Sequence, residues 1–538
     1  MVAIIDNINS TVNDSFVGRF FEMKERNTNF TTELRGATAT FLTMSYILAV
    51  NPRILADSGG PCVPGEGGIF APEYEMCLQN ITKQYVTATA LCSMVGCLTM
   101  GLLANLPIAL STGMGLNAYF TYSVVGFRGT GPVAYDAAIT AVLIEGIIFL
   151  VLAVTGVRFF LVKLIPEPVK LATPAAIGAF LAHLGLQTAE GVGMVVSDIA
   201  TAVTLGGCPE EKRVSIVAYT EACETLGICV KSDAYTCDDL GGIMTSGTMW
   251  LGILGFMIMV VLMAYKRNSS MIIGIAFVTF ISWFRDTAVT YFPDNDSGNA
   301  RFEYFQQIVT VEPMDMITAQ YTGDLKKAGL SLFTFLYVDF LDTSGTLYAL
   351  VSSMGYIDED GNFPRSRQAF AADAISTIFG SIFGCSPVTS YIESAAGVEA
   401  GSKTGLTAVI CAFYFFISIF FAPILANIPP WATGGSLVIV GSLMCRSLVK
   451  IKWYDPSHAV TAFITIMIMP LTYSIGYGLI AGMGCYFFLE GTFFLLSLVG
   501  IEKPVHLPPK EENVKEVKEL DVKEGDVESD NDKEVEVA

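Results

Sequence analysis

The sequence predicts an all-α, polytopic membrane protein with about fourteen transmembrane segments. Two observations lead to this prediction. Apolar residues make up 52% of the 538 residues and charged residues only 15%, whereas a soluble chain of this length carries roughly a quarter charged residues. Long apolar stretches also recur along the whole chain, from residues 36–51 to residues 476–498. We therefore expect most of this chain to be embedded in a lipid bilayer.

Several of these stretches approach or pass the roughly 20 apolar residues that cross a ~30 Å hydrocarbon core. Clear examples are residues 407–426 and 459–473. We expect spans at 36–51, 84–103, 107–125, 134–157, 170–188, 246–265, 271–292, 328–350, 368–383, 388–400, 404–426, 432–449, 459–474 and 476–498.

The distribution of basic residues predicts the orientation of the spans, because Lys and Arg of short loops favour the cytoplasmic side. With the N-terminus inside, most of them fall on that side, and the short outer loops keep little beyond Arg53, Lys83 and Arg128. An even number of spans then leaves both termini in the cytoplasm. Residues 1–30 are polar and do not resemble a cleaved signal.

The end of the chain, residues 501–538, is rich in Glu, Lys, Asp and Val. We expect a disordered cytoplasmic tail, because this segment lacks the apolar content that offsets the entropy of folding. The tail supplies a good share of the net charge of −20. The net negative charge therefore says little about the membrane-spanning part of the chain. Nothing in the sequence favours a nucleic-acid partner.

Six of the twelve cysteines lie in the two long outer loops, at Cys62, Cys77, Cys208, Cys223, Cys229 and Cys237. Even numbers of cysteines in an oxidising compartment are typical of disulfides. The simplest pairing in the first loop is Cys62 with Cys77, and free thiols are the alternative.

Two predicted spans are interrupted. The third contains Asn105–Phe120, in which Pro107, Gly113 and Gly115 break the helical pattern, and the tenth contains Gly384–Gly397, broken by Pro387. A broken segment cannot face lipid, because its freed backbone amides would lack hydrogen-bond partners. We therefore expect both segments to pack around a polar cavity, as in many transporters. Two ordinary kinked helices are the alternative.

Carboxylates accompany these segments. Asp339 and Asp342 are three residues apart in the eighth span, hence on one helical face, and Glu393 lies in the tenth. A charged carboxylate at mid-bilayer costs roughly 2.5–3.5 kcal/mol, so a cluster of three indicates function. Burial and mutual repulsion favour the protonated form of a carboxyl, so Asp339 and Glu393 are candidate proton carriers.

Each carboxylate also has a structural explanation. Ser390 and Glu393 fit a helix capping box, and Asp342 could hydrogen-bond to the opposite broken segment. Glu145, in the fourth span, is expected to pair across helices. No metal-ligand spacing stands out, no GxxxxGK[ST] loop is present, and no nucleophile–base pair points to an enzyme. No cofactor is expected. The energy would come from an ion gradient, with H⁺ as the expected coupling ion, or the transport would be facilitative.

Four stretches resemble the AzgA-like purine permeases of the nucleobase–ascorbate transporter fold group. These are Phe30–Gly60, the GMGLNAYF motif at Gly113–Phe120, the FLYVDFLDTSGTLY motif at Phe335–Tyr348, and SYIESAAGVEAGSKTGLTAV, which begins at Ser390. The resemblance runs from about residue 30 to residue 498. The acidic tail and the cysteine-rich loop at 205–240 lie outside it.

The resemblance implies fourteen spans in two inverted repeats of seven, forming a core and a gate domain. The corresponding boundaries are 1–30 for the N-terminal segment, 31–160 for the first core repeat, 161–300 for the first gate repeat, 301–426 for the second core repeat, 427–500 for the second gate repeat, and 501–538 for the tail.

The resemblance also implies proton-coupled import of adenine, guanine and hypoxanthine, with substrate contacts at Asn117, Asp339 and Glu393 and supporting roles for Gly115 and Asp342. Where the family has Ala-Pro before GMG, this chain has Ser111-Thr112, which leaves the local geometry open.

Rival functions are the same fold with another solute, such as xanthine, uracil, ascorbate, an inorganic anion or cytokinin-type purines, and a purine channel or non-transporting sensor. The expected location is the plasma membrane. A homodimer is an open alternative.

Overall fold

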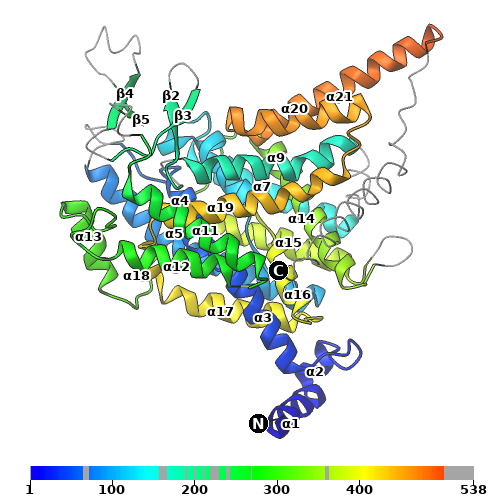
Figure 1. Cartoon of the computed structure of the whole chain (residues 1–538). Coiled ribbons are helices and arrows are strands. Elements are labelled where there is room, and N and C mark those ends of the chain that lie inside the picture. Colours follow the sequence, from blue (N-terminus) through cyan, green and yellow to red (C-terminus); the bar gives the residue numbers. More distant parts are fainter. Residues whose placement is uncertain are drawn as a thin grey trace, which may run out of the picture.

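The computed structural model describes residues 2–64, 72–156, 166–187, 191–198, 202–209, 213–218, 230–237, 243–267, 269–357 and 363–501. The chain is mostly helical (Figure 1). Within these residues, seven helices are long and apolar enough to cross a membrane, the first being Phe30–Ala56 and the last Ile475–Leu498. The expected acidic tail, as well as Cys223 and Cys229, lies outside the described residues.

The first half of the chain contains α1 (Val2–Asp14), α2 (Phe16–Phe20), α3 (Phe30–Met44), α4 (Ile47–Ala56), α5 (Pro72–Thr99), η1 (Met100–Ala104), β1 (Leu110–Thr112), α6 (Met114–Ala118), η2 (Tyr119–Val125), η3 (Phe127–Gly129), α7 (Tyr135–Thr155), α9 (Glu167–Leu186), β2 (Val195–Asp198), β3 (Ala202–Leu205), β4 (Arg213–Ala218), β5 (Val230–Cys237), α11 (Gly247–Ala264), α12 (Ser270–Ser282) and α13 (Asp296–Phe305).

The second half contains α14 (Gly329–Ser353), α15 (Ser366–Ile382), β6 (Val388–Ser390), η6 (Ile392–Ser394), α16 (Ala395–Glu399), α17 (Leu406–Ile419), α18 (Ala422–Ala426), α19 (Pro430–Met444), η7 (Cys445–Lys450), α20 (Pro456–Thr472) and α21 (Ile475–Leu498).

The prediction of an all-α chain is wrong in one respect, because the described residues include three two-stranded antiparallel sheets. Two of them, β2–β3 and β4–β5, lie between α9 and α11, in the second of the two long loops. The third sheet pairs β1 with β6, in the register Leu110↔Ser390 and Thr112↔Val388. Its two strands come from the two interrupted spans. Polar backbone at mid-membrane must be hydrogen-bonded, and here each broken segment supplies the partner of the other.

The helices pack in two groups. One group is formed by α9, α11, α12, α19, α20 and α21, with α9 packed against both α19 and α20. The other is formed by α3, α4, α5, α6, α7, α14, α15 and α17, with α7 packed against α15 and α14. The β1–β6 sheet belongs to the second group, since β1 contacts α5 and β6 contacts α14 and α15. Helices α6 and α9 form one of the contacts between the groups.

The turn between η1 and β1 shows how the sequence ends a helix before a broken segment. Asn105 adopts a left-handed conformation with φ 53°, which Asn tolerates better than most residues. Its side chain accepts a hydrogen bond from the Gly405 backbone N–H at 2.8 Å, and its carbonyl accepts one from Arg26 at 2.7 Å. The end of the helix is thereby tied both to the residue before α17 and to the N-terminal segment.

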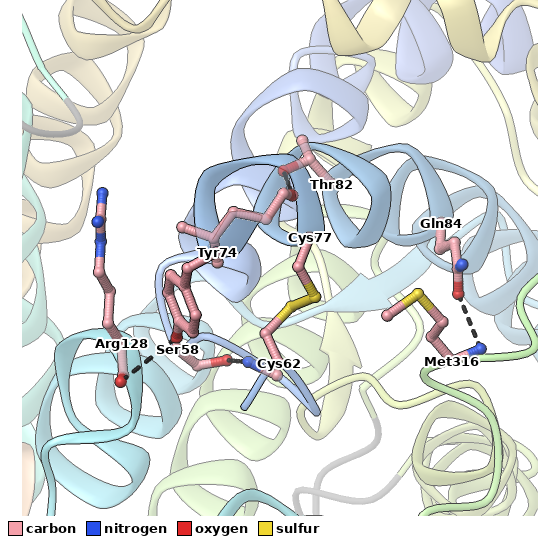
Figure 2. The surroundings of a disulfide bond; sticks show 10 residues. Ser58, Cys62, Tyr74, Cys77, Thr82, Gln84, Arg128 and Met316 are labelled. Atoms are coloured by element: carbon pink, nitrogen blue, oxygen red, sulfur yellow. Dashed lines mark hydrogen bonds between the residues drawn. A yellow bond between two sulfur atoms is a disulfide. The ribbon is translucent and has the colours of Figure 1, made fainter. Parts of the chain in front are cut away.

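The first long loop is closed by the Cys62–Cys77 disulfide, the pairing expected from the sequence, with the two Cα atoms 6.1 Å apart. Cys77 lies in the second turn of α5 (Figure 2). Nearby, the Tyr74 hydroxyl donates to the backbone carbonyl of Arg128 at 3.4 Å. The loop after α4 is therefore held against the start of α5. Cys208 of the second long loop is also disulfide-bonded.

Candidate functional site

The centre of the candidate site is the crossing of the two interrupted spans at β1 and β6. All six strand residues are buried. Beyond the strands, the Gly113 N–H donates to the Pro387 carbonyl at 3.0 Å, and the Tyr391 N–H donates to the Ala109 carbonyl at 3.0 Å. Helix α6 follows directly after Gly113, and η6 follows after Tyr391. Both helical segments therefore start at the same buried crossing.

Asn117 lies on α6 and is fully buried. Its amide oxygen accepts a hydrogen bond from the Ser386 hydroxyl, and its amide nitrogen donates to Thr112 Oγ1 at 3.4 Å. The Asn117 side-chain amide thus links β1 to the loop that precedes β6. These contacts hold the amide at the crossing, where it has both a donor and an acceptor group.

Thr112, the last residue of β1, is central to this network. Its hydroxyl accepts from Asn51 Nδ2 at 2.6 Å, and its carbonyl accepts from the Tyr391 hydroxyl at 2.5 Å. The amide oxygen of Asn51, which is fully buried on α4, has no hydrogen-bond partner among the described residues. An orphaned acceptor costs roughly 1–3 kcal/mol, so this oxygen is available to a donor group of a bound solute.

Glu393 lies in η6 and is only 7% exposed. Its carboxylate accepts a hydrogen bond from the Tyr46 hydroxyl at 2.6 Å. The capping-box alternative is wrong. Ser390 is the last residue of β6, Tyr391 occupies the cap position, and the Ser390 hydroxyl has no partner among the described residues. The strand pairing competes for Ser390 and keeps it away from the start of the helical turn.

Asp342 and Asp339 both lie on α14 but have different neighbours. Asp342 is partly exposed and interacts electrostatically with Glu393. Asp339 is fully buried and contacts the carboxyl group of Glu145 on α7. The three-residue spacing therefore places Asp342 nearer to Glu393 and Asp339 deeper in the helix packing. The expectation that Glu145 pairs across helices also fits this contact.

Several residues of this site escaped the sequence analysis. Tyr46 and Asn51 lie in the Phe30–Gly60 stretch, where Asn-Pro inside an apolar run was an available signal. Asp373, fully buried on α15, accepts a hydrogen bond from the Thr343 hydroxyl at 2.8 Å. The signal for Asp373 in the sequence was an acidic residue inside a predicted span, the same kind of signal that drew attention to Glu145.

The crossing is tightly packed. Asn117, Asp339 and Asp373 have no exposed surface. Two cavities of the described part of the chain lie elsewhere, one of about 460 Å³ along α3 and one of about 210 Å³ beside Arg53, Lys83 and Tyr304. A solute can contact the buried side chains of Asn117, Asp339 and Asp373 only if the groups around them move.

Buried carboxyl groups beside two interrupted, mutually paired spans define a secondary transporter of the membrane. Comparisons with known proteins agree with this assignment. Residues 36–207 and 234–480 match the profile of the Permease family (Xan_ur_permease). The chain belongs to this family and is a transporter, not an enzyme.

Curated relatives match along most of the chain. An Aspergillus versicolor protein named efflux pump notK' is 41% identical over 92% of this chain and 85% of its own length. A putative xanthine/uracil permease of Schizosaccharomyces pombe is 39% identical over 92% and 78%, respectively. The guanine/hypoxanthine permease PbuO of Bacillus subtilis is 34% identical over 87% and 93%. The resemblance to purine permeases is thus confirmed.

Solved structures show the same fold at low sequence identity. The structure of SLC26A9 matches with a TM-score of 0.53 and 13% identity, covering 92% of this chain and 69% of that one. The transmembrane domain of the cyanobacterial bicarbonate transporter BicA matches with a TM-score of 0.51 and 15% identity, covering 84% and 97%. These likenesses support a polytopic transporter fold.

Proposed function

We propose that this permease is a proton-coupled secondary transporter that imports purine nucleobases by alternating access. The observation that carries the proposal is the buried crossing, where Asn117, Glu393 and the α14 carboxylates meet two broken spans. A purine presents N–H donors and ring nitrogens along a flat edge. Carboxylates accept those donors, and an amide both donates and accepts. The guanine/hypoxanthine transport named for the Bacillus relative supports this substrate class.

In this proposal, Asn117, Asp339 and Glu393 bind the solute, with Asp342 and Gly115 in support. Asp342 interacts electrostatically with Glu393 and would contribute to an acidic edge at the crossing. Asp339 and Glu393 are the candidate proton carriers. The group formed by α9, α11, α12, α19, α20 and α21 would act as a gate and the group with the crossing as a core, in two inverted repeats with fourteen spans and cytoplasmic termini. The tightly packed crossing is consistent with a site that opens only when the core moves against the gate.

Uptake by two variants tests the site. Asp339→Ala and Glu393→Ala should abolish high-affinity purine uptake while both proteins still reach the plasma membrane. Loss of one buried partner costs roughly 1–3 kcal/mol, and more for a charged group. Glu399→Gln, an exposed acid on α16, is the matched control. Full uptake by either alanine variant at equal surface abundance would exclude this site.

A competition panel tests the substrate class. Unlabelled adenine, guanine and hypoxanthine should compete for uptake of labelled hypoxanthine, and uracil should compete poorly. The Schizosaccharomyces relative named a putative xanthine/uracil permease makes xanthine and uracil the principal rivals. Stronger competition by uracil would replace the proposed substrate. Because the Aspergillus relative is named an efflux pump, the panel is run in both transport directions.

A further inference from the structure

A buried carboxyl triad lies behind the crossing. It consists of Glu145 on α7, Asp339 on α14 and Asp373 on α15, and none of the three has any exposed surface. The three carboxyl groups interact with one another, and those of Glu145 and Asp339 are in contact. Two ionised carboxylates have no hydrogen to share, so this contact requires a proton on one of them.

A count of hydrogen-bond donors leads to the same conclusion. Four of the six carboxyl oxygens of the triad receive no hydrogen bond from any described residue, namely both oxygens of Glu145, Oδ2 of Asp339 and Oδ1 of Asp373. The remaining two share one donor, the Thr343 hydroxyl, which lies 2.8 Å from Asp373 Oδ2 and 3.5 Å from Asp339 Oδ1. One hydroxyl hydrogen cannot satisfy three buried anions.

The electrostatic surroundings do not compensate for this shortage. No ion pair among the described residues includes a member of the triad. The titratable groups that interact with the triad are Asp342, which lies on α14 together with Asp339, and, beyond Asp342, Glu393. Both groups are acidic. Isolated buried charges are strongly disfavoured, so the triad needs protons to exist in this packing.

Thr343 connects the triad to the crossing. Its hydroxyl is also 2.8 Å from Thr389 Oγ1 on β6, and Thr389 is paired with Ser111 of β1. When Asp373 is ionised, Thr343 donates to it and accepts from Thr389. When Asp373 carries a proton, its O–H can donate to Thr343, which then donates to Thr389. The proton occupancy of the triad therefore sets the direction of a hydrogen bond at the crossing.

From this arrangement we infer that Glu145, Asp339 and Asp373 form an enclosed proton-binding site, and that Thr343 and Thr389 couple its occupancy to the solute site. Glu145 and Asp373 thereby gain a role in energy coupling, not in solute contact. The inference deepens the proposed function and rests on the proton coupling that it includes.

Glu145→Gln and Asp373→Asn keep the shape of the triad and remove one exchangeable proton each. Purified protein in proteoliposomes is assayed with labelled hypoxanthine in two modes: accumulation driven by a gradient of one pH unit, and counterflow without a gradient. One proton per solute supports about tenfold accumulation per pH unit. We expect the ratio of accumulation to counterflow to fall about tenfold in each variant and to stay at the wild-type value in Glu399→Gln.

A wild-type ratio in both variants would overturn the inference. If a variant does not fold, the wild-type protein still decides the question by infrared difference spectroscopy. A protonated-carboxyl carbonyl band that changes when hypoxanthine binds, and that shifts in D₂O, supports the triad. A spectrum without such a band overturns it. If the wild type shows no counterflow of any purine, the proposed function fails instead. A pH titration of the protonated-carboxyl band, which needs no solute, then tests the triad separately from the proposed function.

Discussion

At the scale of single residues, the site depends on side chains that hold a carboxylate in place. The Tyr46 hydroxyl donates a hydrogen bond to the Glu393 carboxylate at 2.6 Å, although the two residues are far apart in the sequence. The acids Asp339, Asp342 and Glu393 were predictable from the sequence, because charge inside an apolar span is rare and costly. Their partners were not. Tyr and Thr are common in spans, and only the fold brings Tyr46 to Glu393 or Thr343 to Asp373.

Replacement of the Tyr46 hydroxyl provides a residue-scale prediction. Tyr46→Phe should weaken purine binding roughly 10- to 100-fold, because a hydrogen bond to a charged group contributes about 1.5–3 kcal/mol. Binding to purified protein by calorimetry measures the change. The control is Tyr414→Phe, which removes a hydrogen bond to Thr38 away from the crossing. Equal dissociation constants for Tyr46→Phe and the wild type would show that this hydroxyl does not position Glu393 for the solute.

At the scale of elements, the two interrupted spans were expected from Pro and Gly in apolar segments, but their pairing was not. Periodicity identifies a broken helix, whereas the β1–β6 register depends on residues about 280 positions apart (Leu110↔Ser390). Only three residues form each strand, which is too short for a recognisable alternation pattern. The same pairing explains why Ser390 is not a helix cap, although its spacing to Glu393 fits one.

Gly115 is the point where α6 approaches α9. A Cβ at this position would lie 2.5 Å from Ile177 Cγ2. Gly115→Ala should therefore lower the transport rate sharply, because α6 and α9 belong to different helix groups, which slide past each other in the proposed alternating access. Ile177→Ala in the same chain should restore much of the rate. Initial uptake rates measure both effects, with Gly484→Ala, which meets no atom within 4 Å, as the control.

An absence of rescue in the Gly115→Ala/Ile177→Ala double variant would contradict this account. The defect of Gly115→Ala would then arise within α6 and not at its contact with α9.

The disulfide at the N-terminal end of α5 gives a stability prediction. Cys62 and Cys77 are 15 residues apart, and closing a loop of that length contributes about 3 kcal/mol to the free energy of unfolding. Cys62→Ser should lower the melting temperature of the purified protein, and dithiothreitol should lower that of the wild type at least as far, because it also reduces the disulfide of Cys208. Cys485→Ser, at a free cysteine, should leave it unchanged. A Cys62→Ser melting temperature equal to that of the wild type would refute the prediction.

At the scale of the whole molecule, composition alone predicted a polytopic membrane protein, and the family and fold comparisons agree. Among the described residues, seven helices meet the length and apolarity expected of a span. The count of fourteen and the inverted repeats therefore remain predictions. The reason is physical. Spans that face protein and not lipid can be short, broken or polar, as the crossing shows, and length with hydropathy cannot identify them.

The most direct test of the central claim is counterflow and accumulation of labelled hypoxanthine in proteoliposomes, with and without a pH gradient. The account predicts saturable counterflow in both conditions and accumulation only when the lumen is more alkaline, abolished by a protonophore. Conductance without saturable uptake, or accumulation that is indifferent to the pH gradient, would contradict it.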